Sequence, residues 1–149
     1  MKKIFMAAAA VFLLIALTGC GVGKVRNPIS VEKYKEISET NGLTVDIREG
    51  DASTTCNGKG EEYSSQFYVF DTIEKSDAAY EYLISKLVTS VTGENITTEK
   101  TEDEYKKCTV KSTTVYSVVI QLENTLVYAY SLSDDKETLV DEYLKALGY

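Results

Sequence analysis

Histidine and tryptophan are both absent from the 149 residues, and proline occurs only once. Histidine is the usual general base near neutral pH, so its absence excludes Ser-His-Asp and Cys-His catalytic sites. It also excludes zinc sites built on histidine ligands. Any enzyme activity would have to use carboxylate, tyrosine or lysine chemistry alone, and we therefore expect a protein that is not an enzyme.

Basic residues are in the minority, with 16 lysines and arginines against 23 acidic residues. They form no basic patch, which argues against binding to nucleic acid. The acidic residues gather at Glu61-Glu62, Glu102-Asp103-Glu104 and Asp134-Asp135. None of these groups has the Asp-x-Asp-x-Asp-Gly spacing of a calcium loop, so we interpret them as solvated surface. We expect no metal and no cofactor.

Cysteine is scarce, and its three positions are Cys20, Cys56 and Cys108. No Cys-x-x-Cys spacing occurs, which argues against a thioredoxin-like redox role. Cys20 stands apart from the other two because it closes the N-terminal segment, where Met1-Lys2-Lys3 precedes an uncharged apolar run from Ile4 to Leu17. This run is too short to span a membrane, which takes about 20 residues, but it has the length of a signal peptide's apolar region.

The sequence Leu17-Thr18-Gly19-Cys20 at the end of this run resembles the lipobox of a bacterial lipoprotein precursor. The resemblance implies that the Cys20 thiol receives a diacylglycerol and that signal peptidase II cuts between Gly19 and Cys20. Two or three acyl chains, such as palmitate, give stable anchoring where one does not. The expected location is the extracytoplasmic face of the cell membrane. No family is identified for the rest of the chain.

Three segments are expected: a signal peptide at 1–19, a flexible tether at 20–29 and a single domain at 30–149. Cleavage would leave 130 residues with a net charge of −9, because Lys2 and Lys3 are lost. The tether would reach less than about 20 Å on average, so the domain would lie close to the bilayer. All eleven tyrosines follow the cleavage site and supply large side chains for a core.

The first part of the domain shows a helix and two strands. Ser30 is a predicted N-cap of a helix that ends at Asn41-Gly42. Residues 43–48 alternate between apolar and polar side chains, which predicts a strand. Residues 49–62 are rich in glycine and small polar residues and are predicted to form a loop, which contains Cys56. The aromatic run at residues 66–70 predicts a second strand.

A second helix is predicted from the capping-box spacing of Asp71 and Glu74 and ends at Gly93. Its apolar positions have helical spacing and predict a core-facing stripe: Tyr80, Leu83, Ile84, Leu87, Val88 and Val91. Residues 95–111 mix apolar, charged and hydroxyl side chains, which is typical of one half-exposed or edge strand.

The strongest strand signal is a hairpin. Residues 116–122 and 126–132 alternate on either side of a tight turn at Glu123-Asn124, and we expect this hairpin at the centre of the sheet. Asp134 and Glu137 have capping-box spacing before a last amphipathic helix. The order α-β-β-α-β-β-β-α predicts an α+β domain with an antiparallel sheet of about 4–5 strands and helices packed on one face.

The state of Cys56 and Cys108 is left open by the sequence. An extracytoplasmic domain permits a disulfide, which would close a loop of about 50 residues and stabilise the fold by roughly 4 kcal/mol. The alternative is two thiols, one in a loop and one half-buried in a strand. We favour the interpretation in which Cys56 and Cys108 lie close together. Lys106 shares a predicted strand face with Cys108 and could lower the pKa of its thiol, although a structural cysteine is the favoured interpretation.

The function expected from these observations is a membrane-anchored, non-catalytic domain that binds another protein or acts as an accessory domain, with an unknown protein partner. The alternative is a lipoprotein that binds a small ligand or a metal. A two-lobed transport receptor would need about twice this length. A hydrolase that uses carboxylates is the least favoured class.

Overall fold

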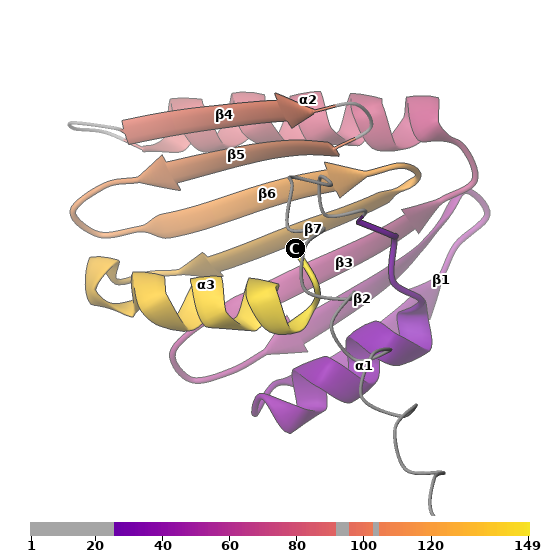
Figure 1. Ribbon diagram of the computed structural model, residues 1–149, viewed down its shortest axis with the longest axis horizontal. Helices are drawn as coiled ribbons and strands as arrows, with labels where there is room; N and C mark the ends of the chain where they lie inside the picture. Colours follow the sequence, from indigo (N-terminus) through magenta and orange to yellow (C-terminus); the bar gives the residue numbers. More distant parts are fainter. Residues whose placement is uncertain (1–25, 92–95, 103–104) are drawn as a thin grey trace, which may run out of the picture.

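A computed structural model describes residues 26–91, 96–102 and 105–149 (Figure 1). The predicted signal peptide, the cleavage site at Gly19 and Cys20, and the predicted helix stop at Gly93 lie outside these residues. Across the described residues, no helix has both the length and the apolar character needed to cross a membrane.

The described strands form one antiparallel seven-stranded sheet with the order β1-β2-β3-β7-β6-β5-β4. Their bounds are β1 Thr44–Glu49, β2 Ser53–Lys59, β3 Ser64–Phe70, β4 Ile96–Glu102, β5 Tyr105–Lys111, β6 Tyr116–Leu122 and β7 Thr125–Ser131. The helices are α1 Val31–Thr40, α2 Ile73–Ser90 and α3 Glu137–Ala146, with a short 3₁₀ turn, Asp134–Lys136, before α3. The α+β class and the central position of the β6–β7 hairpin agree with the prediction.

Helices cover both faces of the sheet, so the prediction of helices on one face is wrong. In Figure 1, α1 and α3 lie in front of the sheet and α2 lies behind it. We call these sides the α1/α3 face and the α2 face. The reason is visible in β6, where every residue is buried. Val118 and Ile120 face the α1/α3 core, whereas Val119 faces the α2 core together with Leu126 of β7. Two apolar faces need a cover on each side.

Two strands were missed by the sequence pattern, which explains the predicted count of 4–5. The segment predicted as a loop contains β2, which pairs with β3 along its whole length and with β1 from Thr54 to Lys59. The segment predicted as one strand is a hairpin of β4 and β5, in which Glu102 lies opposite Tyr105. Neither segment has strong alternation, so long-range pairing decides its conformation.

The predicted caps are confirmed at the first helix and wrong at the other two. The Ser30 side chain accepts a hydrogen bond from the Lys33 amide at 3.2 Å, and Gly42 has a φ of +83° where the helix ends. Helix α2 is capped by Thr72 rather than by Asp71, which forms an ion pair with Lys75 instead. The N-cap position of α3 makes no side-chain capping bond.

The candidate disulfide between Cys56 and Cys108 is contradicted by the sheet order. Cys56 lies on β2 and Cys108 on β5, with β3, β7 and β6 between them, a separation of roughly 19 Å at about 4.8 Å per strand. Cys56 belongs to the α1/α3 core and Cys108 to the α2 core, so the two thiols also lie on opposite faces. A disulfide needs Cα atoms within about 7 Å, and the two residues are not joined.

We expect both cysteines to carry thiols in the isolated domain. Mass spectrometry of the unlipidated domain, denatured in iodoacetamide without reductant, should show two added alkyl groups. Burial raises the pKa of the Cys56 thiol to about 11, so the native protein should react far more slowly than the denatured one. Denatured protein that takes up no alkyl group would contradict the strand order.

Candidate functional site

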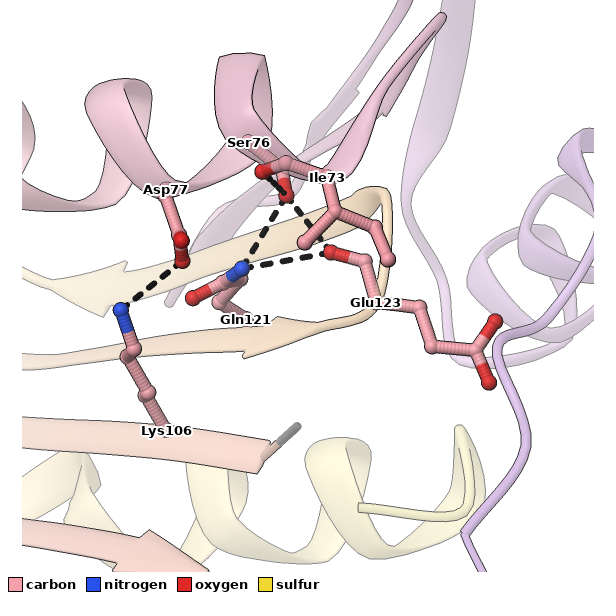
Figure 2. Close-up of polar contacts among 6 residues, drawn as sticks. All are labelled: Ile73, Ser76, Asp77, Lys106, Gln121 and Glu123. Atoms are coloured by element: carbon pink, nitrogen blue, oxygen red, sulfur yellow. Dashed lines mark hydrogen bonds and ion pairs between the residues drawn. The ribbon is translucent and has the colours of Figure 1, made fainter. Parts of the chain in front are cut away.

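A buried polar cluster lies where α2 begins beside the β6–β7 turn (Figure 2). The Ser76 Oγ lies 2.6 Å from the carbonyl oxygen of Glu123 and accepts a hydrogen bond from the Gln121 Nε2 at 3.1 Å. Glu123 has a φ of +52°, which is uncommon for a residue with a side chain and reflects the tight turn. Ser76 is fully buried, so no substrate can reach its hydroxyl. This cluster fastens α2 to the turn and is structural.

The ion pair of Lys106 and Asp77 borders this cluster, as Figure 2 shows. The two groups are 2.8 Å apart, and the hydrogen bond from Lys106 is the main reason why the pKa of Asp77 is lowered. Lys106 and Cys108 share the α2 face of β5, as predicted, but the Lys106 ammonium group is directed to Asp77. Cys108 is 1% exposed, which excludes a reactive thiol open to solvent.

A second buried cluster consists of hydroxyl groups between α1 and α3. The Ser38 Oγ and the Tyr143 Oη are 2.8 Å apart, and Tyr34 and Ser65 lie beside them. All four residues are almost completely buried. Burial raises the pKa of both tyrosines, so their hydroxyls stay protonated at physiological pH. The cluster is closed to solvent and joins α1 to α3 on one face of the sheet.

An open groove lies on the α2 face, beside the last turn of α2. Its volume is about 250 Å³, and we call it the α2 groove. It is lined by Leu87, Ser90, Val91, Thr114, Val115, Tyr128, Tyr130 and Leu132. The rings of Tyr128 and Tyr130 stack at a centroid distance of 4.8 Å. Leu132, which also lines the groove, is 77% exposed.

The lining of the α2 groove combines apolar side chains with hydroxyl groups in comparable measure. None of the described residues that line it is charged. Burial raises the pKa of Tyr128, so its hydroxyl remains neutral and can donate or accept a hydrogen bond. A cavity of about 150 Å³ is enough for a benzene ring, whereas drug-sized ligands occupy about 300–1,000 Å³. The groove therefore has the size of one or two side chains.

The sequence pattern found only part of this groove. The predicted core stripe of α2 is buried at Tyr80 and Leu87, but Val88 is 44% exposed and Val91 lines the groove. Tyr128 and Tyr130 share a strand face, as predicted for the hairpin, but they are only partly buried. The sequence signal that could have pointed to the groove was the pair of tyrosines at i and i+2, because tyrosine combines an apolar ring with a polar hydroxyl group.

The acidic groups form surface ion pairs or stay exposed where they are described. Glu61 and Glu62 are exposed, and Glu62 pairs with Lys136 at 2.7 Å. Asp135 is also exposed. In the ranges 26–91, 96–102 and 105–149, no three histidine, cysteine or carboxylate side chains are close enough to hold a metal ion.

Comparison with solved structures shows a likeness of fold. No family model matches the chain. No curated protein matches it either. The fold is similar to a crystal structure of a GTP binding regulator from Thermotoga maritima, with a TM-score of 0.51 and 16% sequence identity. The similarity covers 82% of this chain and 88% of the other. At this identity the likeness shows a shared fold and nothing about function.

Proposed function

We propose that this protein is a membrane-anchored extracytoplasmic lipoprotein whose domain binds another protein through the α2 groove and performs no catalysis. The α2 groove carries the proposal, because it joins a slot lined by leucine, valine and tyrosine side chains to an exposed leucine. Interfaces between proteins gain most of their affinity where an apolar or aromatic side chain enters such a slot.

The alternative is a small ligand, and the volume of the groove together with the hydroxyls of Ser90, Thr114 and Tyr130 supports it. A ligand that binds the folded state should raise the melting temperature, which a screen by thermal shift would detect. A nucleotide is a poor candidate at this groove, because none of the described lining residues is a lysine or arginine that could bind phosphate. A carboxylate hydrolase has the least support, since no described carboxylate lines the groove.

Lipid anchoring depends on Cys20. We expect the precursor to incorporate a clickable fatty acid and to fractionate with membranes in its bacterial host, and Cys20→Ala to abolish both. Cys56→Ala is the matched control, because it removes a thiol that lies in the core. A Cys20→Ala protein that still carried the label in the membrane fraction would contradict the lipoprotein assignment.

Partner binding at the α2 groove can be tested by photo-cross-linking. We expect a benzophenone amino acid at Leu132 to give one discrete adduct in cells, and the same probe at Ile73 to give none. Ile73 is also an exposed apolar residue, but it lies at the opposite end of α2. The blocking variant Ser90→Phe fills the groove from its rim and should remove the adduct. Equal cross-linking from both positions would contradict a specific groove.

A further inference from the structure

The tether is fastened to the domain at one end of the sheet. The Arg26 guanidinium lies over the ring of Tyr105, 4.0 Å from its centroid. Tyr105 is 5% exposed, and Ile29 packs against the same α1/α3 core. The C-terminal Tyr149 also lies against this core and close to Tyr105. From Arg26, the first residue that the structure describes, the chain is therefore attached to this end of the α1/α3 face.

The α2 groove lies near the opposite end of the strands from Tyr105. Tyr105 starts β5 and lies in register with Leu122, beside the β6–β7 turn. The groove is lined by Thr114 and Leu132, which follow the opposite ends of β5 and β7. Six residues separate the two ends of β5, which is roughly 20 Å at about 3.4 Å per residue. The groove also lies on the other face of the sheet.

The remaining tether is short. Six Cα–Cα steps join Cys20 to Arg26, so a fully extended chain spans at most about 20 Å. If Arg26 were not attached to Tyr105, the first attached residue would be Ile29, and the connection from Cys20 to the domain would be three residues longer. A connection of this length that is attached to the α1/α3 face keeps that face nearer to the bilayer than the α2 face.

We propose that the contact of Arg26 with Tyr105 orients the lipid-anchored domain, with the β6–β7 turn toward the bilayer and the α2 groove away from it. This inference rests on the proposed lipid at Cys20. Glu123 lies in the β6–β7 turn at the membrane-facing end and would be repelled by anionic lipid, and Asp71, which follows β3 at the same end, is paired with Lys75. Chain restraint therefore causes the orientation, and lipid charge does not. The occupant of the groove is then an apolar side chain of a protein partner, presented from the side opposite the membrane.

The test uses the absence of tryptophan from the native sequence. Lipidated full-length protein with a single reporter, Ile73→Trp at the β6–β7 end or Leu132→Trp at the groove, is placed in phosphatidylcholine vesicles with a dansyl headgroup acceptor. We expect energy transfer from position 73 to exceed that from position 132 at least threefold, at low and at high salt. Arg26→Ala should bring the ratio close to one, whereas Lys33→Ala, which removes an exposed charge from α1, should leave it unchanged.

Each outcome has one meaning. Protein that does not float with the vesicles overturns the lipid anchor and the orientation together. Protein that floats but transfers energy equally from both positions overturns the orientation alone. A ratio that survives Arg26→Ala shows that Arg26 is not the fastening point. Circular dichroism of each variant checks that the fold is intact.

Discussion

Raising the pH from 10 to 12 is expected to unfold the domain, because several of its tyrosines are buried as neutral phenols. Tyr34, Tyr116 and Tyr143 are at most 3% exposed. Burial is the main reason why the pKa of each of these three tyrosines is raised. The nearby Asp141 carboxylate raises the pKa of Tyr116 further. Burial also raises the pKa of Tyr63 and of Tyr149 to about 12.

The direction in which pH changes the free energy of unfolding follows from how many protons the folded and the unfolded chain bind. Below pH 10 the tyrosines are protonated in both states, so the stability they contribute is fully present. Above pH 10 the unfolded chain loses these protons, while the folded chain keeps them until its own higher pKa is reached. Each buried tyrosine then lowers the free energy of unfolding by about 1.4 kcal/mol per pH unit. Three of them lower it by about 4 kcal/mol per unit, against a typical total stability of 5–15 kcal/mol.

Phenolate absorbance and circular dichroism, recorded together, check this prediction. We expect the phenolate signal of the buried tyrosines to appear in the same cooperative step as the loss of backbone signal, between about pH 11 and 12. Tyr34→Phe tests the role of one buried phenol directly, because the Tyr34 Oη has no partner in hydrogen-bond geometry and its removal breaks no hydrogen bond. The variant should change the stability at pH 7 by less than about 1 kcal/mol and unfold at a higher pH than the parent.

Tyr82→Phe is the control for the alkaline transition, since Tyr82 is 64% exposed. Its unfolding curve should overlay that of the parent. If Tyr34→Phe unfolds at the same pH as the parent, the buried phenol of Tyr34 does not drive the transition, and the proposed burial of this residue is wrong.

Replacing Phe67 with alanine is expected to lower the free energy of unfolding by about 3–5 kcal/mol. Phe67 is fully buried on β3 and stacks on Tyr34 of α1, with ring centroids 4.9 Å apart. It lies opposite Cys56 of β2 and Val127 of β7, so its ring fills the space where three strands and a helix meet. Urea unfolding at neutral pH measures the loss.

Phe70→Ala is the matched control, because Phe70 lies on the same strand but is only partly buried. We expect it to cost less than about 2 kcal/mol, since less apolar surface is lost. Equal losses for the two variants would contradict the packing of Phe67. If Phe67→Ala is too unstable to purify, Phe67→Leu should still fold and cost about 1.5 kcal/mol.

The sequence alone determined the features that depend on neighbours along the chain. Ser30 and Gly42 bound the first helix as expected, because a cap and a left-handed glycine act on the backbone beside them. The β6–β7 hairpin was also predicted, since two alternating runs on either side of a two-residue turn can pair in only one register. These local signals were enough for the α+β class and the central hairpin.

Tertiary structure decided the features whose partners are distant. Residues 53–59 have the composition of a loop, yet they form β2 because β1 and β3 supply hydrogen bonds on both sides. The Tyr34 Oη would lie 3.0 Å from a Cβ at Gly58, so a glycine that looks like a loop residue makes room for a packed helix. The α2 groove exists because α2 ends beside Tyr128 and Tyr130 and leaves them partly uncovered. Periodicity can show that a side chain is apolar, but whether it is covered depends on where another element ends.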